Sequence, residues 1–145
     1  MPASILHDVY LPHSPERVWR ALTDSDAIAK WLMPNDFEPR LGHRFTFRTD
    51  PMPGLNFDGI CHGEVTALDP PRLLAYTWIG GPLTYTLVTY RLEPEGDGTR
   101  LRFEHSGFDL DDPLQQASYR GLSGWGPVLE RGLRRVVDEL AVAQA

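Results

Sequence analysis

The sequence predicts an α+β fold in which a curved antiparallel sheet of about six strands wraps around a long C-terminal helix. The sheet is indicated by segments in which apolar and polar residues alternate, joined by short turns that favour antiparallel neighbours. A helix as long as this one is not stable alone, so we expect its apolar stripe to lie on the sheet. The stripe runs between about Asp112 and Leu140 at steps of three and four and consists of Leu122, Trp125, Leu129, Leu133, Val136 and Leu140.

The N-terminal part predicts one strand followed by two short helices. Alternating residues predict the strand from Ile5 to Leu11. Ser14 followed by Pro15 is typical of a helix start, because serine caps the first turn and proline is tolerated at the first helical position. A polar break at residues 23–25 separates this helix from a second one, which ends near residues 31–33 before Pro34. Residues 34–42 are expected to form a loop.

The middle of the chain predicts five further strands in a meander. Clusters of Pro, Gly and Asp at residues 50–54, 69–71, 80–82 and 95–98 supply the turns between them. Gly59 and Gly63 interrupt one of these strands and predict bulges or bends there. The expected strands cover residues 43–49, 56–68, 73–78, 84–92 and 99–106.

The C-terminal helix contains residues that helices disfavour. Pro127 lacks an N–H group and kinks a helix that runs through it. Either the helix begins near Trp125 with Pro127 in its first turn, or one helix bends at Gly126-Pro127, with small residues making room for a neighbour or a ligand. The glycines concerned, each costing about 1 kcal/mol relative to alanine in a helix interior, are Gly121, Gly124, Gly126 and Gly132.

The composition is that of a single globular domain covering residues 1–145. The net charge of −6, with Lys30 as the only lysine, argues against nucleic-acid binding, which needs clustered basic residues. No apolar run approaches the roughly 20 residues that span a bilayer, and residues 1–8 lack the pattern of a secretory signal. We therefore expect no membrane partner and a cytoplasmic location. Cys61 is the only cysteine, which excludes an internal disulfide.

One face of the predicted sheet is rich in aromatic residues. If the sheet grips the helix, this face surrounds a space with few polar groups, which is the usual form of a small-molecule site. The alternative is that the rings simply pack together and fill the interior. The candidate ligand-binding residues are Trp31, Phe45, Phe47, Tyr76, Trp78, Val88, Tyr90, Phe103, His105 and Trp125.

Few residues form patterns that indicate a particular chemistry. His105 lies on the predicted inner face, where it either acts on a polar ligand atom or is hydrogen-bonded to a neighbour. His62 and Glu64 share a strand face that His43 can approach, but they match no metal motif. The acidic cluster of residues 109, 111 and 112 lacks the glycine and glutamate of a calcium loop and is interpreted as the loop and cap before the long helix. No catalytic residue, metal or cofactor is predicted.

Several motifs resemble those of one family, in the same order along nearly the whole chain. They include Ser14 to Thr23, Lys30-Trp31, Gly63-Glu64-Val65, residues 69–73, Tyr76-Thr77-Trp78, residues 98–101, residues 105–108 and Gly124-Trp125-Gly126-Pro127. The chain is similar in these to activator of Hsp90 ATPase homologue-like proteins, which belong to the START-like, or Bet v 1-like (SRPBCC), superfamily. The resemblance implies a helix-grip fold with a cavity between sheet and helix, and it implies no shared catalytic residues.

Three hypotheses about function follow. The first is a protein that binds a small apolar or aromatic molecule between sheet and helix. The second is a cyclase- or hydrolase-like enzyme acting on a bound aromatic compound, in which His105 and Tyr76 or Tyr90 would face one cavity. The third is an interaction module linked to a chaperone, which would show an exposed apolar patch. The co-chaperones of the family carry a further N-terminal domain that this chain lacks, which argues against a chaperone partner. Assembly into a homodimer is left open.

Overall fold

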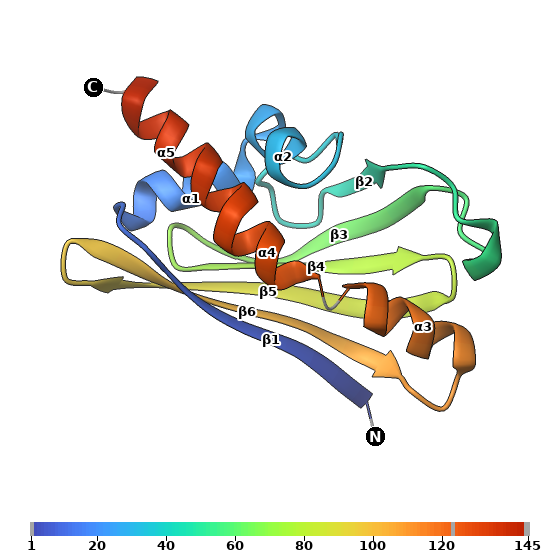
Figure 1. Ribbon diagram of the computed structural model, residues 1–145. Coiled ribbons are helices and arrows are strands. Elements are labelled where there is room, and N and C mark those ends of the chain that lie inside the picture. The colour runs from blue at the N-terminus through green and yellow to red at the C-terminus, as the bar shows by residue number, and fades with distance from the viewer. Residues whose placement is uncertain (1, 123, 144–145) are drawn as a thin grey trace.

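A six-stranded antiparallel sheet, which does not close into a barrel, forms the framework of the molecule (Figure 1). The structure is a computed structural model that describes residues 2–122 and 124–143. The spatial order of the strands is β1-β6-β5-β4-β3-β2. Their bounds are Pro2–Leu11 (β1), Arg44–Arg48 (β2), Ile60–Asp69 (β3), Leu73–Gly80 (β4), Leu83–Glu95 (β5) and Gly98–Asp109 (β6).

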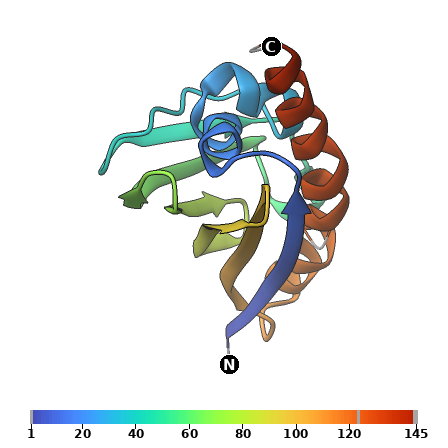
Figure 2. The same ribbon diagram turned by 90° about the vertical axis from the view of Figure 1, so that its left-hand side faces the viewer.

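The helices gather on one side of the sheet, and the sheet curves around them (Figure 2). Two short helices follow β1, namely α1 (Pro15–Thr23) and α2 (Ser25–Trp31). The C-terminal part contains α3 (Pro113–Leu122), α4 (Trp125–Pro127), the π-helical turn η2 (Val128–Leu133) and α5 (Arg134–Ala143). A 3₁₀ turn, η1 (Pro53–Leu55), lies between β2 and β3. This arrangement is the helix-grip fold that the sequence predicts.

The helix starts follow from local capping. The Ser14 side chain accepts a hydrogen bond from the Arg17 N–H at 3.3 Å, and Pro15 occupies the first turn of α1. Asp112 likewise accepts a bond from the Leu114 N–H at 2.9 Å, which confirms its interpretation as the cap of a helix. The first turns therefore have partners for main-chain donors that a helix leaves unpaired.

The C-terminal helical segment agrees in part with each of the two interpretations of Pro127. It is helical from Trp125 to Ala143, so that Pro127 stands in the first turn, where its missing N–H leaves no bond unmade. The residues before it form a separate helix, α3, rather than a continuous bent helix. Gly126 and Gly132 do make room for neighbours, because a Cβ atom there would lie 3.0 Å from the His7 ring and 3.4 Å from the Trp31 carbonyl oxygen.

The strand boundary that differs most from the prediction is the start of β3. Residues 56–59 were expected to open the strand that the structure begins at Ile60. Asn56 and Gly59 instead adopt positive φ angles of 53° and 90°, which turn the chain and exclude an extended strand. The segment from Met52 to residue 59 consequently forms a separate loop at the end of the sheet, closed by a bridge between Met52 and Phe57.

None of the helices in the described part of the chain is both long enough and apolar enough to pass through a membrane.

Candidate functional site

The aromatic residues of the predicted inner face lie in the interior of the molecule. All ten candidate residues are buried, none of them more than 6% exposed. Their rings contact one another at favourable distances: the ring centroids are 5.2 Å apart for Phe45 and Tyr76, and 4.6 Å for Phe103 and Trp125. The space between the sheet and the C-terminal helix is therefore largely occupied by the rings themselves.

His105 belongs to a buried chain of hydrogen bonds across this interior. The Trp125 indole N–H donates to Nδ1 of His105 at 3.2 Å, so the proton of the neutral ring resides on Nε2. Nε2 lies 2.8 Å from the Thr86 hydroxyl, which in turn donates to the Trp78 carbonyl oxygen at 2.6 Å. Burial lowers the pKa of His105 from 6.5 to about 3. The ring is thus held neutral, with both nitrogens engaged.

The two buried tyrosines form a separate pair. The hydroxyl groups of Tyr76 and Tyr90 lie 2.8 Å apart and are hydrogen-bonded to each other. Burial raises the pKa of Tyr76, and that of Tyr90 is raised by burial together with its tyrosine partner. His105 and these tyrosines are therefore satisfied in two different networks. This arrangement does not supply the shared point of attack that the enzyme hypothesis requires.

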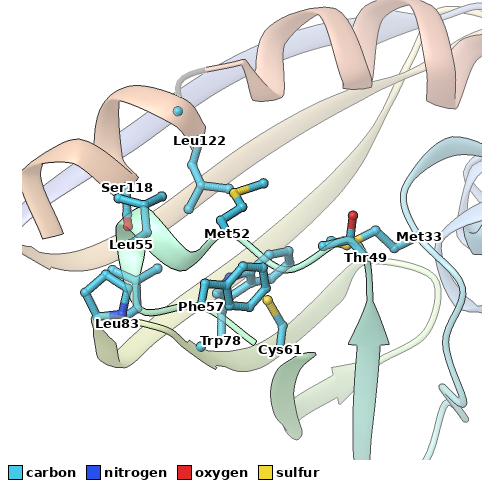
Figure 3. Close-up of a pocket in the computed structure, with 13 residues that line it drawn as sticks. Met33, Thr49, Met52, Leu55, Phe57, Cys61, Trp78, Leu83, Ser118 and Leu122 are labelled. Atoms are coloured by element: carbon cyan, nitrogen blue, oxygen red, sulfur yellow. The ribbon is translucent and has the colours of Figure 1, made fainter. Parts of the chain in front are cut away.

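A pocket opens beside this aromatic core, at the end of the sheet (Figure 3). It has a volume of about 290 Å³ and lies between the loop that contains η1, the ends of β3, β4 and β5, and helix α3. Trp78 is the one candidate residue of the ten that lines it. The lining residues are Met33, Thr49, Met52, Leu55, Phe57, Cys61, Trp78, Gly80, Pro82, Leu83, Ser118, Gly121 and Leu122.

Two glycines at the turn from β4 to β5 allow the η1 loop to close one wall of this pocket. A Cβ atom on Gly80 would lie 3.2 Å from the Phe57 ring, and one on Gly81 would lie 3.1 Å from the Phe57 Cβ. The absence of side chains at these positions lets Phe57 pack on the main chain. Helix α3 forms the facing wall, through Ser118, Gly121 and Leu122.

Cys61 contributes a thiol to the pocket wall. Its side chain is buried, and it projects from β3 beside Trp78 and Phe57 (Figure 3). Burial, together with the smaller effect of the nearby negative charge of Asp58, raises the pKa of the Cys61 thiol to about 12. The group is therefore a neutral thiol at physiological pH and not an activated nucleophile.

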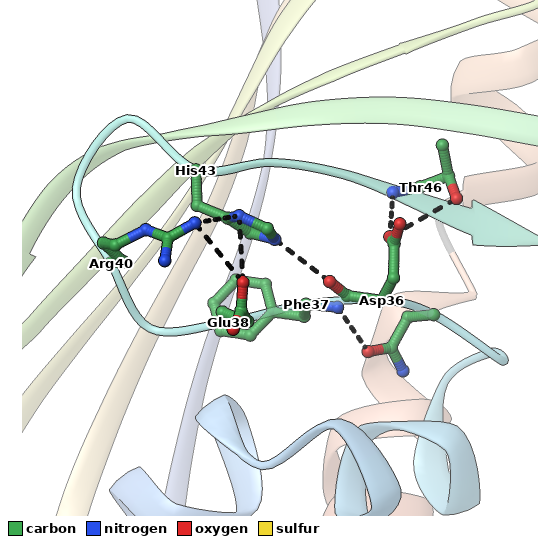
Figure 4. Close-up of polar contacts among 7 residues, drawn as sticks. Asp36, Phe37, Glu38, Arg40, His43 and Thr46 are labelled. Carbon is green, nitrogen blue, oxygen red and sulfur yellow. Dashed lines mark hydrogen bonds and ion pairs between the residues drawn. The ribbon is translucent and has the colours of Figure 1, made fainter.

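A network of polar contacts fastens residues 34–43 to β2 and closes the interior on that side (Figure 4). The Asp36 carboxylate accepts a hydrogen bond from the Thr46 N–H at 2.6 Å, and His43 Nε2 lies 3.0 Å from the Asp36 carbonyl oxygen. The loop inserts Phe37, only 3% exposed, against Phe45 at a centroid distance of 5.0 Å. Sequence reasoning missed Phe37, because it stands alone among polar residues in a loop.

His43 and Glu64, two of the three residues weighed above as metal ligands, have other partners in the structure. His43 contacts Glu38, and Glu64 is paired with Arg44 at 3.0 Å. Within residues 2–122 and 124–143, no three His, Cys, Asp or Glu side chains are placed to hold a metal ion. His62 and Glu64 line a second, more open hollow on the outer face of the sheet.

Most of the pocket was missed by the sequence analysis. Met52 and Phe57 lie in what was interpreted as a turn followed by a strand, and Ser118 was not considered as a lining residue. Gly121 was considered only as one of the small residues that make room for a neighbour or a ligand in a bent helix. One signal was present in the sequence: three large apolar residues within a segment rich in Pro and Gly. Apolar side chains concentrated in a loop indicate that the loop covers something.

Comparisons with known proteins identify relatives of this fold. A protein from Mesorhizobium loti, MLL2253, is 36% identical, with a TM-score of 0.80, over 94% of this chain and 98% of that one. The Bacillus halodurans protein BH1534 is 26% identical, with a TM-score of 0.75, over 93% and 96%. The Aha1 dimer from Colwellia psychrerythraea is 24% identical, with a TM-score of 0.63, over 90% and 98%. The comparison with curated proteins gave no match.

The sequence model of one family covers most of the chain. Residues 12–140 match the model for activator of Hsp90 ATPase homolog 1-like proteins. The match runs from the start of α1 into α5, so it includes every element that builds the pocket described above. Together with the helix-grip architecture and the relative at 36% identity, it establishes that the chain belongs to the family of activator of Hsp90 ATPase homolog 1-like proteins, within the START-like superfamily.

Proposed function

We propose that this protein, as a single domain over residues 1–145, binds a small apolar molecule in the pocket between the η1 loop, the sheet and helix α3. The observation that carries this proposal is the character of the walls. They combine large apolar side chains, including Phe57, Trp78 and Leu122, with only two hydroxyl groups, from Thr49 and Ser118. An apolar hollow with few polar groups is the usual form of a small-molecule site.

The position of the pocket also supports the proposal. The aromatic core beneath it is closely packed, so a ligand that sits against Trp78 does not disturb the framework of the fold. The mouth is formed in part by Met52, which is 48% exposed. Methionine is unbranched and flexible, so it adapts to ligands of different outline.

A blocking substitution tests the proposal. Gly121 lines the pocket, and a Cβ atom added there meets nothing within 4 Å, so a side chain can start at this position and Gly121→Trp adds a large ring at the pocket wall. A ligand from a panel of lipids and aromatic compounds, present at about 100 times its Kd, stabilises the wild type by about 2.7 kcal/mol. This raises its melting temperature by about 5–10 °C. We expect the Gly121→Trp protein to lose this shift, measured by differential scanning calorimetry.

The matched control places the same ring elsewhere. Leu41 is 64% exposed in the loop before β2, at the opposite end of that strand from Thr49. Leu41→Trp should keep the full thermal shift. If no member of the panel stabilises the wild type, or if both tryptophan variants retain the shift, the pocket is not the binding site.

We also propose that the open edge of the sheet supports a homodimer. At the other edge, the Thr46 and Arg48 N–H groups of β2 donate to Asp36 and to the Pro34 carbonyl oxygen. Strand β1 forms the remaining edge and exposes 68% of Leu6, which favours pairing with a second copy. The solved relative from Colwellia is described as a dimer. Light scattering should show a dimer that Leu6→Lys converts to a monomer and Leu41→Lys leaves intact.

A further inference from the structure

The pocket has no group that can neutralise a charged ligand. Among the described residues, the thirteen that line it include no Lys, Arg, His, Asp or Glu. The polar atoms of its side chains are the hydroxyls of Thr49 and Ser118, the thiol of Cys61 and the indole N–H of Trp78. Since an ionised carboxylate loses its hydration on burial, it needs a paired charge or several donors to be stable. These walls provide neither.

A negative charge acts on one wall of the pocket. Asp58 stands in the η1 loop, and its electrostatic effect reaches the Cys61 thiol in the pocket wall. The Asp58 carboxylate is held in place by the Ile60 N–H at 3.0 Å. The protein as a whole carries a net charge of −6. An anionic ligand therefore meets repulsion in addition to its loss of hydration.

The volume limits the size of the occupant. The pocket of about 290 Å³ is at the small end of the range for ligand sites. It corresponds to the space of about ten water molecules in the liquid, and hence to a molecule of roughly ten to fifteen non-hydrogen atoms. A fused two-ring aromatic compound has this size and matches the flat faces of Trp78 and Phe57 (Figure 3).

Building on the proposed function, we infer that the pocket selects an uncharged two-ring-sized apolar molecule, such as an aromatic alcohol or ketone, and rejects the corresponding carboxylic acid. An apolar pocket that holds an acid needs a cationic side chain or several hydrogen-bond donors as partners. Here the selection comes from the neutral walls together with the negative charge of Asp58.

The test compares two ligands of nearly the same shape. The probes are 2-naphthalenemethanol and 2-naphthoate, measured by isothermal titration calorimetry with the full chain at pH 7.5. We expect the alcohol to bind at least about 100-fold more tightly than the carboxylate, because the carboxylate is buried without a partner. Equal affinities would overturn the inference and leave the proposed function standing. Binding of neither probe, nor of any uncharged compound of the panel, would remove both.

Two lysine variants locate the origin of the selection. Met52 is half-exposed at the mouth, so Met52→Lys can place an ammonium group beside a bound carboxylate while its stem stays on the apolar wall. We expect this variant to bind 2-naphthoate at least tenfold more tightly than the wild type does. Leu41→Lys adds the same charge on the exposed loop before β2 and should give no gain. An equal gain in both variants would mean that net charge, and not the pocket wall, excludes the acid.

Discussion

The buried histidine provides a quantitative test of how the core is built. Between pH 6.5 and 3 the unfolded chain protonates residue 105, whereas the native protein keeps His105 neutral because burial holds its pKa near 3. The unfolded state then binds more protons, so stability falls as the pH falls through this window and is independent of this residue above it. The pKa values of residue 105 in the unfolded and the native state differ by 3.5. This difference corresponds to about 5 kcal/mol of folding stability, of which about 2 kcal/mol is lost by pH 5.

The assay compares slopes rather than absolute stabilities. Urea unfolding of the wild type and of His105→Gln is followed by tryptophan fluorescence from pH 7.5 to pH 5. The variant is less stable throughout, because the Trp125 N–H loses the His105 acceptor and the Thr86 hydroxyl loses the His105 donor. It should nevertheless lose about 2 kcal/mol less than the wild type over this range. His62→Gln removes an exposed histidine from the outer face of the sheet and should keep the wild-type slope. Parallel slopes for wild type and His105→Gln would refute the reasoning.

Two further substitutions probe the interior. Tyr76→Phe leaves the Tyr90 hydroxyl buried without its partner and should lower the free energy of unfolding by about 1–3 kcal/mol, whereas the double variant with Tyr90→Phe should lose less than the sum of the single changes in urea titrations. Gly63→Ala places a methyl group 2.5 Å from the Phe45 ring and should lower the free energy of unfolding by about 1–3 kcal/mol, measured the same way. Gly54→Ala, whose added methyl group meets nothing within 4 Å, should leave the unfolding midpoint nearly unchanged. Equal effects at both glycines would contradict the packing argument.

The sequence predicted the fold well because periodicity reports which face of an element is buried. Phe45, Tyr90 and Phe103 alternate with polar residues along their strands, and all three are buried in the structure. The apolar stripe of the C-terminal helix is also buried as predicted at its centre, where Leu129 and Leu133 are fully buried. In each case the signal repeats over many residues, so single exceptions do not obscure it.

The candidate site was harder to predict, because the pocket is built from segments without periodicity. Phe57 reaches the pocket through a turn set by Asn56 and Gly59, and it packs on Gly80 from a different part of the sequence. Such meetings depend on tertiary structure and leave no local pattern. The inward face of a strand was predictable, but whether its rings would leave a hollow depended on how neighbouring rings interlock, which a sequence pattern does not report.

The placement of the pocket outside the ring-packed core has a consequence for how the family can diversify. The residues that would choose a ligand, in the η1 loop and at the end of α3, are largely distinct from those that hold the framework together. Substitutions at Met52 or Gly121 can therefore alter which ligand would bind, with little loss of folding stability. Evolution of new specificities on this scaffold is then expected to concentrate in these two short stretches, while the strands beneath them stay constant.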